Sequence, residues 1–237
     1  GHVELTTVEA LPTVQGRLQG EGLAAAGVTA SLGDGGDALH ISGPFGNRLV
    51  LRQCSEAEAT TIAGAGSHPG GSASLTTMPR VVFPVLPGSA PRVAAFYTQV
   101  MGIAALLDEE KKTTVTFGGA WGSQTLVFEE TEDAPPAVPC SAFSPDVDTG
   151  VHVAVYYATD AEFEAAFDRT LAAGLLYVNK RFESSAPEFG SAKTREDAMK
   201  YRQFRVLRLV DPESGAVGGC LEHEVRGPSH KAFPAGV

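Results

Sequence analysis

An internal repeat constrains the fold of this 237-residue chain more than any single residue does. Residues 81–85 and 152–155 are short apolar runs, and each leads into a stretch with the apolar spacing of a helix. Further short apolar runs follow in both copies, and they close on acidic segments at 128–130 and 221–224. A fainter copy occupies residues 2–53. A repeat of roughly 50 residues predicts a fold assembled from copies of one supersecondary unit.

The first copy is expected to contain a strand, a helix and three further strands. Pro12 suits the first turn of a helix, where its missing N–H is not needed. Short β-prone runs separated by turn residues, such as Gly46 and Asn47, predict strands at 2–5, 28–32, 38–42 and 48–52. Residues 54–78 then follow as a predicted linker, because Gly, Ser, Ala and Thr dominate from 63 to 77.

The middle copy, residues 79–131, has the clearest helix. Its apolar residues follow the helical period, Ser89 suits the N-cap, and Gly102 suits the left-handed position that ends a helix. Strands are expected at 113–117 and 124–129. The proline-rich residues 132–149 are expected to form a loop between modules.

The third copy, residues 150–226, repeats this plan and leaves 227–237 as a tail. Asp160 is the predicted N-cap of its helix, and Gly174 is the predicted stop. The expected strands span residues 151–157, 177–182, 204–210 and 219–225. The polar residues 183–200 form an insertion that is too long for a simple turn, which makes them a candidate lid.

Composition excludes several classes of partner. The net charge of −10 argues against nucleic acid, because phosphate binding needs clustered Lys and Arg. No apolar run approaches the roughly 20 residues of a spanning helix, so we expect no membrane partner. Cys54, Cys140 and Cys220 lack C-x-x-C spacing and predict reduced thiols in an intracellular compartment, cytoplasmic or organellar. The opening Gly1-His2 is compatible with a targeting segment that has been removed.

One acidic cluster points to a site. Strand alternation places Glu222 and Glu224 on one face of the last predicted strand, with His223 on the other. The cluster lies between Leu221 and Val225, in what reads as an interior strand. A buried carboxylate is unfavourable without a cation or strong hydrogen-bond donors. Glu222 is therefore the strongest single candidate for a functional residue.

The turn and helix-end motifs of the three copies are similar to those of one known superfamily. The matching motifs are residues 95–102 (AFYTQVMG), 151–155 (VHVAV) before Asp160, Asp211-Pro212 before Leu221-Glu222, and 43–47 (GPFGN). With these motifs the chain resembles the vicinal oxygen chelate superfamily, which includes glyoxalase I, extradiol dioxygenases and bleomycin-binding proteins. The resemblance implies an α+β fold: repeated βαβββ modules pair into a curved mixed sheet around a cavity, with the helices on the outer face.

The same resemblance implies how the modules pair. Modules 79–131 and 150–226 are the natural pair, and module 2–53 is left without a mate. Either it pairs with the equivalent module of a second chain, or a preceding module has been lost. Because unpaired strand edges favour association, we expect a homodimer.

The resemblance also implies a metal centre on the first and last strands of the paired modules. Glu129, His152 and Glu222 are the candidate ligands of a divalent ion such as Fe, Ni, Mn or Zn. The ion would act as a Lewis acid on a small oxygenated metabolite, with Glu222 or Glu224 moving a proton. Tyr156 shares the strand parity of His152, and both Tyr156 and Trp121 are candidate residues of a substrate pocket.

One difference from the superfamily leaves more than one function possible. The superfamily's remaining ligand belongs near Val82, where this chain has no metal-binding side chain. Glu129 is also compatible with a solvent-exposed strand end, and His152 with a strand histidine that only forms structural hydrogen bonds. The candidate functions are therefore a glyoxalase-like metal-dependent lyase, isomerase or dioxygenase, a metal-free protein that binds or sequesters a small molecule, and a structural module that assembles oligomers.

Overall fold

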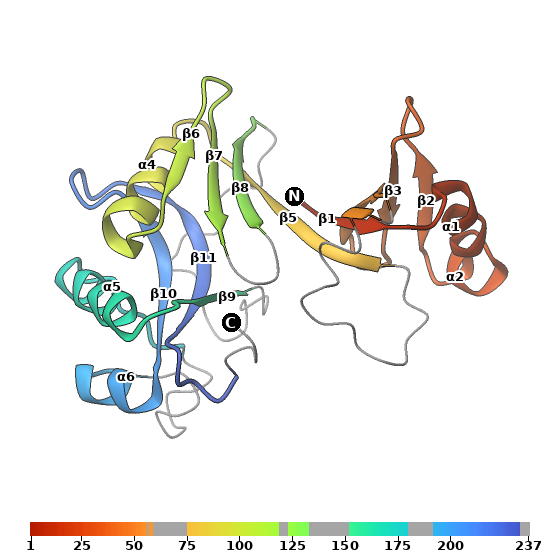
Figure 1. Cartoon of the computed structure of the whole chain (residues 1–237). Coiled ribbons are helices and arrows are strands. Elements are labelled where there is room, and N and C mark those ends of the chain that lie inside the picture. The colour runs from red at the N-terminus through yellow and green to blue at the C-terminus, as the bar shows by residue number, and fades with distance from the viewer. Residues whose placement is uncertain (56, 59–74, 119–122, 133–151, 180–191, 233–237) are drawn as a thin grey trace. The chain divides into compact units, whose positions relative to one another are not determined.

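The structure is a computed structural model that describes residues 1–55, 57–58, 75–118, 123–132, 152–179 and 192–232 (Figure 1). The chain divides into two compact units. The first contains residues 1–83 and 116–127, and the second contains 84–115 and the residues from 128 onward. Among the described residues, no helix has both the length and the apolar character needed to cross a membrane.

The first unit contains the βαβββ plan expected for residues 2–53. It comprises β1 (His2–Thr7), α1 (Leu11–Leu18), α2 (Glu21–Ala25), β2 (Thr29–Leu32), β3 (Ala38–Ser42) and β4 (Arg48–Gln53). Strand β1 pairs in parallel with β4, whereas β3 pairs antiparallel with β2 and β4. Leu11 and Val14 of α1 pack with Leu39 and Leu51 to form its core. The four strands expected from the sequence are confirmed.

Strand β5 (Leu75–Val85) pairs antiparallel with β1 and begins inside the segment expected to be a linker. Three further strands, β6 (Ala105–Leu107), β7 (Lys112–Phe117) and β8 (Gln124–Glu130), complete an eight-stranded mixed sheet in the order β2-β3-β4-β1-β5-β8-β7-β6. A second sheet has the order β10-β11-β9, from β9 (His152–Tyr156), β10 (Gln203–Val210) and β11 (Val217–Arg226). The expected α+β class with a large mixed sheet is confirmed.

The helix of the middle copy ends where the sequence predicts. α4 (Ala90–Ala95) continues into the π-helix η1 (Phe96–Met101), and Gly102 follows with a positive φ of 70°. The side chain of Arg169 donates from Nε to the Val100 carbonyl at 2.8 Å and from Nη2 to the Met101 carbonyl at 3.1 Å. Arg169 thereby satisfies carbonyl groups that a helix end leaves without partners.

The helix α5 (Asp160–Ala172) begins at the residue that was expected to cap it, so its N-cap lies one residue earlier. Thr159, not Asp160, is the N-cap: its side chain accepts from the Glu162 backbone N–H, and the Glu162 side chain accepts from the Thr159 N–H. Asp160 is instead the first helical residue, where an acidic side chain interacts favourably with the helix dipole. Gly174 ends the helix with a φ of 65°, as predicted.

The segment between α5 and β10 differs from the prediction. Residues 177–179 form no strand, and the only pairing described there is an isolated bridge between Leu176 and Val206. Residues 180–182 and the first part of the insertion lie outside the described residues. The last part of the insertion forms α6 (Arg195–Tyr201), which the sequence analysis missed although Thr194 caps it.

The cysteines differ in state. Cys54 is a reduced thiol, whereas Cys220 is disulfide-bonded. The expectation of three reduced thiols is therefore wrong for Cys220. Disulfides persist in oxidising environments, so this finding does not support the reducing compartment on which the expected intracellular location depends.

Candidate polar site on the three-stranded sheet

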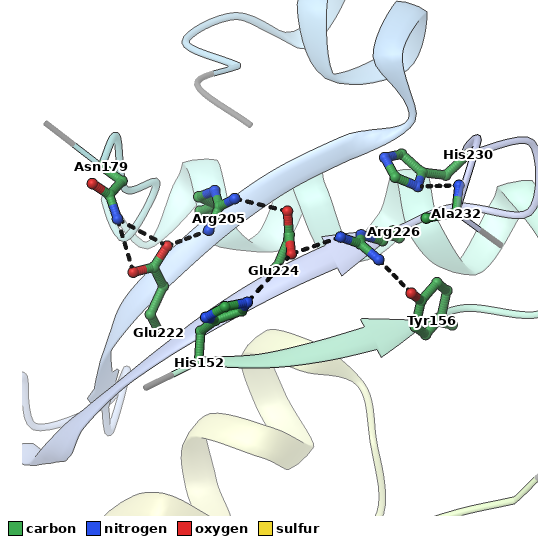
Figure 2. A network of polar contacts seen from close by, with 9 residues as sticks. All are labelled: His152, Tyr156, Asn179, Arg205, Glu222, Glu224, Arg226, His230 and Ala232. Atoms are coloured by element: carbon green, nitrogen blue, oxygen red, sulfur yellow. Dashed lines mark hydrogen bonds and ion pairs between the residues drawn. The ribbon is translucent and has the colours of Figure 1, made fainter. Parts of the chain in front are cut away.

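The three-stranded sheet has one apolar face and one polar face. The apolar face of β11 packs against α4 and η1, and His223 is buried there against Phe96 and Tyr97. Glu222 and Glu224 lie on the opposite side of the strand from His223, as strand alternation predicted, and Figure 2 shows both carboxylates next to Arg205. We call this side the polar face, and it carries His152, Tyr156, Arg205, Glu222, Glu224 and Arg226.

Arg205 lies between the two carboxylates. Strand pairing places Arg205 of β10 opposite Glu224 of β11. Its Nη1 donates to Glu222 Oε1, and its Nη2 donates to Glu224 Oε1 at 2.7 Å. Only 5% of the Arg205 side chain and 8% of each carboxylate side chain are exposed. One buried guanidinium thus donates hydrogen bonds to two buried carboxylates.

The remaining carboxylate oxygens also receive donors. Asn179 Nδ2 lies 3.0 Å from Glu222 Oε2 and 3.3 Å from Oε1. Arg226 Nη2 donates to Glu224 Oε2 at 2.7 Å, and its Nη1 donates to the Tyr156 hydroxyl. All four carboxylate oxygens therefore accept at least one hydrogen bond from a side-chain N–H.

His152 lies at the accessible edge of this network. Parallel pairing places His152 of β9 opposite Glu222, and its Nε2 is 3.9 Å from Glu224 Oε2. About half of the His152 side chain, 48%, is exposed, whereas the carboxylates beside it are buried. Solvent molecules and ligands can therefore reach the imidazole.

His230 lies close enough to Arg226 and Glu224 for their charges to act on its imidazole (Figure 2). Its Nδ1 accepts from the Ala232 N–H at 3.1 Å, which orients the ring. Burial, and then the positive charge of Arg226, lower the pKa of His230, and Glu224 opposes this shift. His230 therefore favours its neutral form next to the Arg226–Glu224 pair.

Beneath the polar face, a buried pair joins β11 to η1. The Tyr97 hydroxyl is 2.6 Å from His223 Nε2, and His223 Nδ1 is 2.7 Å from the Leu221 carbonyl. A carbonyl accepts only, so Nδ1 carries the proton and Nε2 accepts from Tyr97. Burial lowers the pKa of His223 to about 4, and it raises the pKa of Tyr97 well above its usual value.

Of the three expected metal ligands, two lie on paired strands and the third has a different neighbour. His152 and Glu222 are paired across β9 and β11, whereas Glu129 on β8 lies 3.4 Å from Lys112 Nζ with 44% of its side chain exposed. The described part of the chain contains no group of three or more His, Cys, Asp or Glu side chains that could hold a metal ion. Trp121 lies outside the described residues.

The donor chemistry of the polar face does not fit a divalent cation in this arrangement. Arg205 places a fixed positive charge between Glu222 and Glu224, where a cation shared by the two carboxylates would bind. Two guanidinium groups already balance the two carboxylates, so an added ion would bring uncompensated positive charge. We therefore derive no chemical step through a metal.

The sequence analysis did not place Asn179 or Arg226 at the site, and it did not predict that Arg205 pairs with Glu222 and Glu224. Arg205 carried a usable signal, because it stands between Phe204 and Val206 in a predicted interior strand. A charged residue in such a place needs a partner of opposite charge. The acidic pair of the next strand supplies it.

Comparison with known proteins gives a fold likeness only. No family model matches the sequence, and no curated protein matches it. Among solved structures, glyoxalase I from Zea mays is 14% identical, with a TM-score of 0.46 over 96% of this chain and 66% of that one. A possible glyoxalase from Bacillus cereus is 10% identical, with a TM-score of 0.36 over 63% of this chain and 97% of that one. An integron cassette protein from V. cholerae is 13% identical, with a TM-score of 0.32 over 63% of this chain and 94% of that one. At TM-scores below 0.5, these likenesses assign neither a family nor an activity.

Proposed function

We propose that this chain is a glyoxalase-like protein that binds a small oxygenated molecule at its polar face without a divalent cation. The single observation that supports this proposal is the position of Arg205, which donates to both Glu222 and Glu224 and places a fixed positive charge between them. The site is then complete as a set of hydrogen-bonding groups, and it needs no ion to stabilise its carboxylates.

The energetic cost of this buried network favours a functional role over a purely structural one. Burying charged groups is unfavourable, and apolar residues of similar size often stabilise a fold as well as a buried ion pair does. A sheet needs no such network on one face, so the polar face calls for another explanation. A role in binding a ligand at the accessible His152 is the explanation that we favour.

The accessible groups define the ligand chemistry. His152 is half exposed beside buried carboxylates, and Tyr156 lies on the same face of β9. An imidazole and a phenol hydroxyl exchange hydrogen bonds with hydroxyl and carbonyl oxygens. A small hydroxy or oxo compound, bound through these two side chains, is the ligand class that we propose.

A thermal-shift screen tests this proposal. The protein is dialysed against EDTA, and small hydroxy and oxo compounds are then added. A ligand at about 100 times its Kd stabilises the folded protein by about 2.7 kcal/mol, which gives a measurable rise in Tm. We expect the rise to be lost in His152→Ala and reduced in Tyr156→Phe. The exposed Arg208 on β10 provides the matched control, Arg208→Ala, which keeps the rise.

Two results would contradict the proposal. One is a ligand response that appears only after a divalent metal is added back. The other is a response that His152→Ala leaves unchanged.

A metal-dependent lyase or isomerase is the second candidate, and one observation favours it. The register between β9 and β11 brings an imidazole, His152, next to the carboxylate of Glu222, a pairing suited to divalent transition metals. Elemental analysis of the protein purified without chelator tests this alternative. Stoichiometric Fe, Ni, Mn or Zn that Glu222→Gln abolishes would replace the first proposal.

We also propose that the chain forms a homodimer through the module of residues 2–53. Strand β2 is an edge strand of the eight-stranded sheet, and exposed edges favour pairing with another chain. Light scattering coupled to size-exclusion chromatography measures the mass directly. We expect twice the chain mass of 24.7 kDa, and a monomer at micromolar concentration would contradict the proposal.

A further inference from the structure

We propose that the ligand oxygen beside His152 belongs to an uncharged hydroxyl group, which donates to the carboxylate of Glu224 and accepts from the imidazole. This inference rests on the proposed function and narrows its ligand class, because His152 and Tyr156 alone suit hydroxy and oxo compounds alike. It makes Glu224 a residue that determines specificity, although only 8% of its side chain is exposed.

The distance between the two side chains sets the position of this oxygen. His152 Nε2 lies 3.9 Å from Glu224 Oε2, which is too long for a direct hydrogen bond (Figure 2). An oxygen at about 2.7 Å from Oε2 and about 2.9 Å from Nε2 connects them, with an angle of roughly 90° at that oxygen. The proton and the lone pairs of a hydroxyl group diverge by a similar angle, so one hydroxyl can serve both side chains.

Glu224 decides the direction of these hydrogen bonds. A carboxylate oxygen only accepts, so the single proton of the hydroxyl group points to Glu224. Oε2 accepts from Arg226 Nη2 at 2.7 Å, and a carboxylate oxygen has a second lone pair for a further donor. A lone pair of the hydroxyl oxygen then faces His152, whose Nε2 must carry a proton. Binding therefore selects the tautomer of His152 with its proton on Nε2.

Other polar groups fit this position less well. A carbonyl oxygen has no proton to place between itself and Glu224, so two acceptors would face each other. A ligand carboxylate would add a like charge at short range. An ammonium group would bring a positive charge close to Arg226, whose guanidinium already donates to the same carboxylate oxygen. The polar face balances two guanidiniums against two carboxylates, which also favours an uncharged ligand.

A purely structural role of Glu224 leads to a different expectation. If its carboxylate only held the strands together, a ligand at His152 would bind equally well with or without a proton to donate. A neutral imidazole alone both donates and accepts, so it does not distinguish an alcohol from a ketone. The relative affinity of an alcohol and a ketone therefore separates the two interpretations.

Four compounds with one polar group each test the inference on the wild-type chain. 2-Butanol, butanone, 2-butylamine and butyrate carry a hydroxyl, a carbonyl, an ammonium and a carboxylate group. Each is titrated at pH 7.5 in EDTA, and NMR follows the ring signals of His152, which the variant His152→Gln identifies. We expect 2-butanol to bind about tenfold more tightly than each of the others, because only the hydroxyl group pairs with both side chains. The nitrogen shifts of the bound ring are expected to show the proton on Nε2.

One variant and its matched control place this preference at Glu224. Glu224→Gln replaces the carboxylate by an amide, which both donates and accepts, so the preference for 2-butanol over butanone is expected to disappear. Glu213→Gln makes the same change at an exposed glutamate of the turn before β11, and it keeps the wild-type preference. If Glu224→Gln does not fold, the four compounds and the tautomer of the wild type still decide the inference.

The inference is overturned if butanone, 2-butylamine or butyrate binds at His152 as tightly as 2-butanol, or if none of the four compounds moves its signals. A ring that keeps its proton on Nδ1 when 2-butanol is bound also overturns it. These failures are distinguishable from the failure of the proposed function. Equal binding of alcohol and ketone at His152 without metal contradicts only the hydroxyl assignment. Binding that requires a divalent metal, or that His152→Ala leaves unchanged, contradicts the proposed function itself.

Discussion

The buried His223 makes the fold sensitive to acid in a defined pH range. Its neutral ring accepts from the Tyr97 hydroxyl at Nε2 and donates from Nδ1 to the Leu221 carbonyl, so both nitrogens are already in use. Protonation would place a second hydrogen on Nε2, opposite the Tyr97 donor, in a site fully screened from water. Burial accordingly lowers the pKa of His223 from 6.5 to about 4 in the folded state.

The sign and size of the effect follow from linkage. Below pH 6.5 the unfolded chain binds a proton at His223, whereas the folded chain does not until the pH approaches 4. The stabilisation is thus complete above pH 6.5 and is lost as the pH falls to about 4. At about 1.36 kcal/mol for each pH step, this one residue removes about 3 kcal/mol from the free energy of unfolding over that range.

Urea unfolding of wild type and His223→Gln at pH 7, 6, 5 and 4.5 measures this term. Carboxylates also titrate in this range, but they are the same in both proteins and cancel in the difference. We expect the stability advantage of the wild type over His223→Gln to shrink steadily toward acid pH. His40→Gln, which changes an exposed histidine of β3, keeps the acid loss of the wild type. A difference that does not vary with pH, or an NMR titration of His223 near pH 6.5, would refute the reasoning.

Three further outcomes test single residues of the chain. Gly102→Ala forces a φ of 70° on a residue with a Cβ and crowds the Arg169 guanidinium, so thermal unfolding is expected to show a loss of about 1–2 kcal/mol. Thr159→Ala removes the capping box of α5 and is expected to lower the free energy of unfolding in urea by about 1 kcal/mol, whereas Thr159→Ser keeps most of it. Peptide mass spectrometry after alkylation is expected to find Cys54 labelled in the native protein and Cys220 labelled only after reduction; labelling of Cys220 without reductant would contradict the disulfide.

The elements that the sequence predicted well are those that local patterns determine. Strands β3 and β4 lie between clear turn residues, and their alternation is visible within a few residues. Gly102 and Gly174 end their helices because a positive φ excludes most other residues there. Local patterns did not identify the N-cap of α5, which is Thr159 and not the predicted Asp160. Both residue types cap helices, and only the backbone geometry decides between them.

Only part of the site could be predicted from the sequence. The positions of the two glutamates depend on strand alternation, whereas the position of Arg205 depends on the register between two strands. Alternation alone places Glu222 and Glu224 together. The position of Arg205 depends on how β10 pairs with β11. Extending the pairing of Val210 with Val217 without interruption would place Arg205 opposite Glu222. Two irregularities along the hairpin move it opposite Glu224, so that it reaches both carboxylates, and local patterns do not reveal such bulges.

The burial of Glu222 explains why the sequence predicts a cation beside it. A carboxylate between apolar neighbours in an interior strand requires a compensating cation or strong donors. Both an inorganic ion and the arginine side chains of the sheet can supply the compensating charge. They differ in what they leave for a ligand, because an ion offers open coordination positions, whereas Arg205 already uses donors on both carboxylates. In this chain, recognition of a ligand must therefore come from His152 and the other accessible side chains of the polar face.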